Sequence, residues 1–154
     1  MKELVKLIRE ANRRGNKILI CGNGGLAAEA EHFASELVGK YGGDNFVPCL
    51  SLTCNSSLLT ATANDFGFEQ SFSHLVKVLG KANDILIAMT TTQSPNIVAS
   101  IKEAKRKGMV TVCLCGADSK IEAEYLIRIP HSDSVLIQQA ILAVLHEVAT
   151  GVKK

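Results

Sequence analysis

The pattern of apolar and polar positions along the chain predicts short buried strands that alternate with helices. Runs of five or six mostly aliphatic residues have the length of strands that are covered on both faces. They are Lys17–Cys21, Val47–Leu52, Asp84–Met89, Val110–Cys115 and Tyr125–Ile129. Between these runs, apolar residues recur at the three- and four-residue spacing of amphipathic helices. The expected helices are Lys2–Arg14, Leu26–Lys40, Asn55–Ala63, Glu69–Leu79, Pro95–Lys107 and Ser134–Gly151, and the segment Asn64–Phe68 is expected to break the third helix.

This alternation predicts an α/β fold, a three-layer α-β-α sandwich around a five-stranded parallel sheet with right-handed crossovers. We expect the flavodoxin-like strand order 2-1-3-4-5. The chain of 154 residues shows no repeat, linker or low-complexity tract, so residues 1–154 are expected to form a single domain. In such a sheet, ligands bind beyond the carboxyl ends of the strands at the point where the strand order reverses, here between strands one and three.

The composition is that of an ordinary soluble globular protein. Hydrophobic residues make up 47% of the chain, charged residues 21%, and the formal net charge is only +2, which argues against a nucleic-acid partner. The longest aliphatic runs are far shorter than a membrane span, and the first residues lack a signal-peptide pattern. The five cysteines form no CxxC pair. We therefore expect a cytoplasmic protein with neither a nucleic-acid nor a membrane partner.

Two loops at the expected switch point favour an anion. Gly22-Asn23-Gly24-Gly25 follows the first strand and opens a helix, where free backbone N–H groups and the helix dipole favour negative charge. The loop Thr90–Ser94 follows the third strand and is rich in hydroxyl groups. Each loop alone is also compatible with an ordinary turn or strand end. Because the topology brings both loops to one crevice, together they predict a phosphate site.

The helix after the glycine loop carries a second candidate group. His32 and Glu36 lie four residues apart, so their side chains project from the same helical face. Such a pair suits acid–base chemistry or metal binding, and it is equally compatible with a surface ion pair.

A longer motif around these residues resembles a known family. The pattern CGNGG-x-A-x-x-A-x-HFA-x-EL-x-G-x-Y, then ANDFGF, then a hydroxyl-rich SPN loop, is similar to the sugar isomerase (SIS) domain and, within it, to the phosphoheptose isomerases. The similarity runs from about Lys17 to the C-terminus. The resemblance implies a homotetramer with active sites between subunits and one zinc ion per site. It also implies isomerisation of sedoheptulose 7-phosphate to D-glycero-D-manno-heptose 7-phosphate, a step towards the heptose of bacterial lipopolysaccharide or capsule.

The resemblance also assigns roles to individual residues. The metal ligands it implies are His32, Glu36, Gln138 and His146. Glu36 would also be the catalytic base, with His146 as its partner acid or as a ligand only. The substrate-binding residues it implies are Asn23, Gly24, Gly25, Glu36, Asn64, Asp65, Thr90, Thr91, Thr92, Ser94 and Gln138. Gln138 and His146 are separated by about 12 Å along a helix, so their side chains have to lean together to share one ion. Without the motif, Gln138 would be taken for a surface residue and His146 for a satisfied interface histidine.

The sequence also departs from the family pattern. Leu26 stands where the family has a serine, Gln93 where it has Gly-Asn, and Val135-Leu136 where it has a polar approach to Gln138; the chain also begins about one helix later. These departures keep an alternative function open. The chain could be a non-catalytic or weakened SIS protein that binds phosphosugars or serves as a scaffold. One such scaffold is a tetramer that associates with the bacterial replication initiator. That type lacks the last-helix histidine, so His146 favours the isomerase. Because the last helix is apolar on more than one face, we expect at least a dimer built on the first and last helices.

Overall fold

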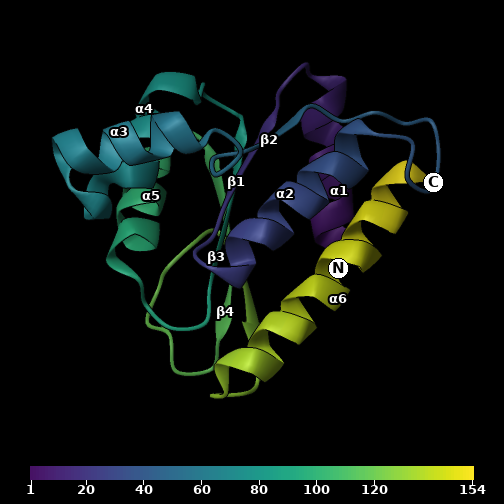
Figure 1. Ribbon diagram of the computed structural model, residues 1–154. Helices are drawn as coiled ribbons and strands as arrows, with labels where there is room; N and C mark the ends of the chain where they lie inside the picture. The colour runs from purple at the N-terminus through teal and green to yellow at the C-terminus, as the bar shows by residue number, and fades with distance from the viewer.

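The computed structural model describes all 154 residues as a parallel sheet with helices on both faces (Figure 1). The strands are β1 (Ile18–Cys21), β2 (Cys49–Ser51), β3 (Ile85–Thr90), β4 (Val110–Gly116) and β5 (Tyr125–Ile129). The helices are α1 (Lys2–Arg13), α2 (Gly25–Val38), α3 (Ser56–Phe66), a 3-10 turn η1 (Phe68–Gln70), α4 (Ser71–Leu79), α5 (Pro95–Arg106) and α6 (Ser134–Lys153). The predicted strands and helices are all present, with ends that differ by a few residues.

The sheet confirms the predicted topology. Its strand order is β2-β1-β3-β4-β5, and all neighbouring strands are parallel. Ile18 of β1 pairs with Cys49 on one side and with Ile85 on the other, so the order reverses at β1. The carboxyl ends of β1 and β3 lead into the glycine loop and the threonine loop, which are therefore neighbours.

Alternating strand residues supply two separate cores. Ile18 and Ile20 of β1 point to the layer of α1, α2 and α6, whereas Leu19 and Cys21 point to the layer of α4 and α5. Figure 1 shows these two helical layers on opposite sides of the sheet. This division follows from the period of two residues in a strand, and it explains why the central strands β1 and β3 are buried on both faces.

The helix α3 breaks inside the expected segment Asn64–Phe68, but it ends three residues later than predicted. The helix begins after Asn55, whose side chain accepts a hydrogen bond from the Leu58 N–H (3.0 Å), and it continues through Phe66. It ends at Gly67, which has a φ of +84° in the left-handed region that favours glycine. Asn64 and Asp65 therefore lie in the last helical turn rather than in a loop.

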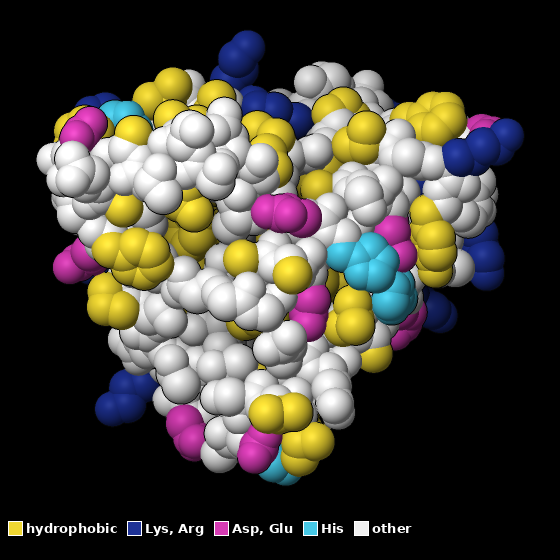
Figure 2. All heavy atoms as spheres, in the orientation of Figure 1, with side chains coloured by type: hydrophobic (Ala, Val, Ile, Leu, Met, Phe, Trp, Pro, Cys, Tyr) yellow, Lys and Arg dark blue, Asp and Glu magenta, His cyan; other side chains and the backbone are white.

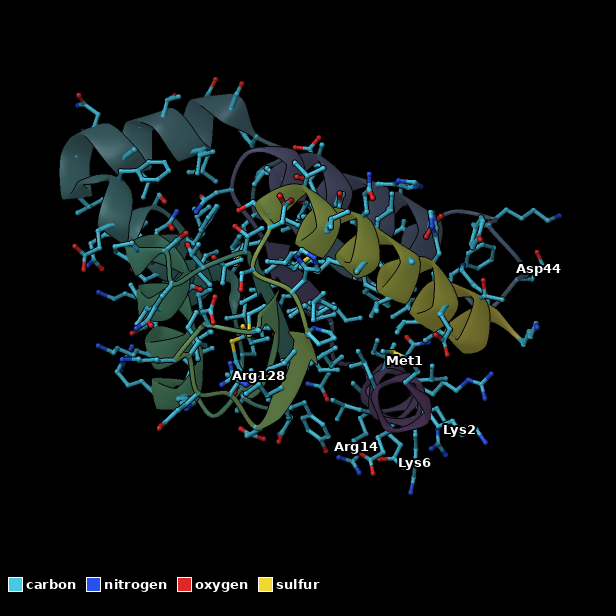
Figure 3. All side chains as sticks on the ribbon, turned by 90° about the horizontal axis from the view of Figure 1, so that it is seen from below. Met1, Lys2, Lys6, Arg14, Asp44 and Arg128 are labelled. Atoms are coloured by element: carbon cyan, nitrogen blue, oxygen red, sulfur yellow. The ribbon has the colours of Figure 1, made fainter.

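The final helix covers one edge of the molecule and packs beside α1 and α2. Asp133 caps α6 by accepting from the N–H groups of Val135 and Leu136. By length and composition α6 resembles a membrane span, but its inner side forms part of the core. Figure 3 shows α1 nearly end-on beside α6, with Lys2 and Lys6 pointing away from the sheet.

Candidate active site

Three side chains from α2 and α6 converge on one point. Oε1 of Glu36 lies 3.2 Å from Nε2 of His32 and 3.2 Å from Nε2 of His146. The two imidazole rings meet edge to face, with centroids 5.1 Å apart. Figure 2 shows histidine side chains next to each other on the face formed by α2 and α6. The spacing of His32 and Glu36 predicted their shared face, and the packing of α6 against α2 adds His146.

This cluster has the chemistry of a site for a divalent cation. One possible ligand atom from each residue lies within 4.8 Å of the other two. The Glu36 side chain is only 7% exposed, whereas those of His32 and His146 are 47% and 38% exposed, so the group is anchored inside and open outside. Two imidazoles and a carboxylate that leave a position open are typical of catalytic zinc. The residues present therefore fit the metal that the resemblance implies.

A second polar group lines a small pocket at the ends of β1 and β3. The pocket has a volume of about 150 Å³ and is lined by Asn23, Leu26, Met89, Thr90, Thr91, Ser94, Ser134 and Gln138. Its hydroxyl groups contact one another: Thr90 Oγ1 lies 3.3 Å from Ser94 Oγ, and Ser134 Oγ lies 3.2 Å from Thr91 Oγ1. The helices α2, α5 and α6 all begin at this pocket. The first N–H groups of α6 already donate to Asp133, so the free donors for a phosphate group come from the starts of α2 and α5, whose first N–H groups lack intrahelical partners.

The two last glycines of the loop serve different purposes. Gly24 has a φ of +57°, a conformation that costs other residues backbone strain. Gly25 has an ordinary conformation, but a Cβ atom at this position would overlap the carboxamide of Gln138. Gly24 therefore permits the turn, and Gly25 lets α6 place Gln138 directly against the start of α2.

The side chain of Asn23 is held by a residue that the sequence pattern did not indicate. Asn23 Nδ2 donates to Asn96 Oδ1 (2.9 Å), and Asn96 Nδ2 donates back to Asn23 Oδ1 (2.8 Å). Asn96 is buried near the start of α5. This reciprocal amide pair ties the glycine loop to the helix that follows the threonine loop. The position of Asn96 in the SPN motif was the only indication of this role in the sequence.

Glu29 is a second residue that the sequence pattern did not indicate. It lies on α2 three residues before His32 and seven before Glu36, on the same helical face, and its exposed fraction is 8%. Burial raises the pKa of the Glu29 carboxyl, while a hydrogen bond from the Gln138 side chain and the charges of His32 and His146 act in the opposite direction. Gln138 itself lines the phosphate pocket and packs against Gly25 at the start of the helix that carries His32 and Glu36.

Other predicted site residues lie apart from these two groups in a single chain. The exposed Asn64 donates to Asp65 Oδ1 (3.1 Å), and neither residue is among those that line the pocket. Thr92 contributes its backbone N–H to Thr90 Oγ1 (3.3 Å), and its own side chain is exposed. The substrate contacts of these three residues stay predictions.

The position of Leu26 makes its replacement a test of the pocket. Leu26 is 4% exposed and belongs to the core, but it also lines the pocket. We expect Leu26→Ser to strengthen phosphate-ester binding by about 1 kcal/mol, the usual value of one hydrogen bond. The same change is expected to lower the free energy of unfolding by about 2–5 kcal/mol, as large-to-small core substitutions do.

Titration calorimetry with a sugar phosphate and chemical denaturation measure these two effects. Leu26→Ala is the matched control because it removes the same side chain without supplying a hydroxyl. If Leu26→Ser binds no better than Leu26→Ala, the pocket does not place the phosphate next to residue 26.

Comparisons with known proteins place this geometry among related enzymes. The family model described as SIS domain matches residues 1–116. A phosphoheptose isomerase from Maridesulfovibrio salexigens is 41% identical over 137 residues, which cover 86% of this chain and 67% of the relative. The structure of a phosphoheptose isomerase from Neisseria gonorrhoeae is similar with a TM-score of 0.91 and 32% identity, covering 98% of this chain and 83% of the other. The corresponding structure from Francisella tularensis gives a TM-score of 0.93 at 28% identity, covering 99% and 84%.

Proposed function

The chain belongs to the SIS domain family and, within it, to the phosphoheptose isomerases, and we propose that it interconverts sedoheptulose 7-phosphate and D-glycero-D-manno-heptose 7-phosphate. One observation supports this reaction above all others. A buried carboxylate, Glu36, contacts two imidazoles, and a pocket suited to phosphate lies at the start of α2, the helix that carries Glu36. An aldose–ketose isomerase of a phosphosugar needs these two parts side by side.

The phosphate end of the sugar would bind in the pocket. The hydroxyls of Thr90, Thr91 and Ser94 and the free N–H groups at the start of α2 supply donors for its oxygen atoms. Asn23 would act mainly through its backbone, because its side-chain amide is already paired with Asn96. Holding the phosphate fixes the distance of the sugar's carbonyl end from the pocket, which favours a defined position of the reacting carbons.

Glu36 would carry the proton between the two reacting carbons. In the forward direction its carboxylate takes a proton from C1 of the ketose, the C1–H electron pair forms the C1–C2 double bond, and the C2 oxygen gains a proton. The resulting cis-enediol loses its O1 proton as the C1 carbonyl forms, and Glu36 returns the proton to C2. His146, at 3.2 Å from Glu36, is placed to exchange the oxygen-bound protons or to serve as a ligand.

We further propose that His32, Glu36, Gln138 and His146 hold one zinc ion per site. The first, second and last of these already form one cluster, and Gln138 would add its carbonyl oxygen from the pocket side. When bound, zinc would supply a Lewis acid that increases the acidity of the C–H bond next to the substrate carbonyl.

The assembly that we propose is a homotetramer, or at least a dimer, whose interface includes α1 and α6. Val135 and Leu136 are 64% and 46% exposed at the start of α6. A groove of about 1050 Å³ also runs between α1 and α6 and reaches His146. Exposed apolar side chains such as Val135 and Leu136 are typical of an interface, whereas the groove itself is lined mostly by polar side chains. Sedimentation velocity at micromolar concentration should show an oligomer, and a stable monomer would contradict this part of the proposal.

We propose a cytoplasmic location and a role in the heptose supply of lipopolysaccharide or capsule.

Proton exchange with solvent tests the reaction directly. The protein is incubated in deuterated water with a panel of ketose and aldose phosphates, and the products are analysed by NMR and mass spectrometry. Deuterium is expected at C2 of the aldose formed from sedoheptulose 7-phosphate, because the base exchanges its proton with water. If no sugar in the panel exchanges although sugar phosphates bind, the protein is a phosphosugar-binding or scaffold protein instead.

A further inference from the structure

We propose that Tyr41 is a positioning residue that holds the imidazole ring of His146 in the orientation in which its Nε2 atom faces Glu36. This inference rests on the proposed function, because it treats Glu36 and His146 as working groups of the isomerase site. Tyr41 is the last residue of the pattern that begins with CGNGG, and it follows the end of α2. Its ring centroid lies 6.3 Å from that of His146, with an angle of 34° between the ring planes.

His146 has few polar contacts that could fix its ring. Its polar contact within the chain is that of Nε2 with Glu36 Oε1 (3.2 Å), so the ring is held at one nitrogen. The torsion that turns an imidazole about its Cβ–Cγ bond is broad, and histidines at metal and catalytic sites usually have a partner on the second nitrogen as well. Ring packing is available here instead. His32 meets the His146 ring edge to face with centroids 5.1 Å apart, and this distance and that of Tyr41 are both in the range of favourable aromatic pairs.

The tyrosine itself is fixed through its loop, which connects α2 to β2 and is tied to the last turn of α6 at both ends. At the start of the loop, the Gly39 carbonyl accepts a hydrogen bond from Lys153 Nζ (2.6 Å). Towards its end, Asn45 Nδ2 donates to the Val152 carbonyl (2.8 Å). Figures 1 and 3 show the loop, with Asp44 labelled in the second, beside the C-terminal end of α6.

Lys153 connects this loop directly to the helix that carries His146. The two residues lie seven positions apart on α6 and therefore on the same helical face. Lys153 is 4% exposed, and its Nζ atom also lies 4.7 Å from the centre of the Phe46 ring. Lysine is almost never fully buried unless its charge has a partner, and the Gly39 carbonyl and the aromatic ring are the partners here. One face of α6 thus both carries His146 and holds the loop that places Tyr41 against it.

NMR of the metal-free protein tests the contact without relying on turnover. The chain has four histidines, so the ring-proton signals of His146 are assigned from their absence in His146→Ala. We expect Tyr41→Leu to shift these signals, because it removes the ring current of the tyrosine, whereas Tyr41→Phe should leave them near their wild-type positions. Tyr125→Leu is the matched control, since Tyr125 is the other tyrosine of the chain and lies on β5, and it should not shift them.

Kinetics at saturating zinc test the role of this contact. Tyr41→Leu is expected to lower kcat by roughly 10- to 100-fold, the range known for partners that orient a metal-site histidine. KM should stay close to that of the wild type, because the phosphate pocket is lined by other residues. Tyr41→Phe should keep most of the activity. Lys153→Met removes the ammonium group that holds the loop, so it should lower kcat in the wild-type background and add little to the loss in Tyr41→Leu.

Unchanged His146 signals or an unchanged kcat in Tyr41→Leu would overturn the proposal and leave the proposed function in place. A loss in Tyr41→Phe as large as that in Tyr41→Leu would also overturn it, because the hydroxyl group rather than the ring would then be required. A wild-type protein that turns over no phosphosugar would overturn the proposed reaction and, with it, this role of Tyr41.

Discussion

Replacing Glu36 with glutamine is expected to lower the turnover of sedoheptulose 7-phosphate by roughly 10²- to 10⁴-fold, the usual contribution of a general base. Glutamine has nearly the same shape but cannot accept a proton from carbon. The phosphate pocket is lined by other residues, so the affinity for a phosphate ester should remain close to that of the wild type. The loss should therefore appear in kcat rather than in KM.

This experiment needs two controls because Glu36 is also a proposed metal ligand. The kinetics should be measured at saturating zinc, and the zinc content of Glu36→Gln should be determined alongside. Glu147→Gln changes an exposed carboxylate next to His146 and should leave kcat unchanged. A Glu36→Gln variant that is metal-loaded and fully active would show that another group moves the proton.

The sequence was sufficient for the fold because the signals are local. Each aliphatic run that alternates with a helix is a buried parallel strand, and Gly24 and Gly67 mark backbone positions with positive φ. The later end of α3 has a local cause as well. Asn and Asp favour caps and turns, but an exposed final helical turn tolerates them, and the helix continues to the residue where the chain requires glycine.

The site was predictable only in part because much of it depends on contacts between distant segments. The spacing of His32 and Glu36 indicates a shared face, whereas their contact with His146 requires α6 to pack on α2. The pairing of Asn96 with Asn23 and the packing of Gln138 against Gly25 have no short-range pattern. Such partners become visible only when the tertiary structure shows which buried polar groups meet.

Removing both histidines is expected to abolish metal binding. Freshly purified wild-type protein should contain about one zinc ion per chain, whereas His32→Ala, His146→Ala should contain almost none, because the two oxygen donors that remain, Glu36 and Gln138, do not hold zinc tightly without imidazole ligands. Elemental analysis by mass spectrometry after gel filtration measures this content. The double variant should keep its fold, since both side chains are well exposed in a cluster that has Glu36 as its buried member.

The matched control is His131→Ala, Glu147→Gln, which changes the same number of residues outside the cluster. His131 is exposed, and its ring accepts a hydrogen bond from the Asp133 N–H (2.9 Å). This control should retain the zinc content of the wild type, and only the variant without His32 and His146 should lose both zinc and isomerase activity. Equal metal content in the two double variants would mean that the ion binds elsewhere. The contact of both imidazoles with one oxygen of Glu36 would then be a hydrogen-bonded network around the base, and catalysis would depend on that network without a metal ligand among these residues.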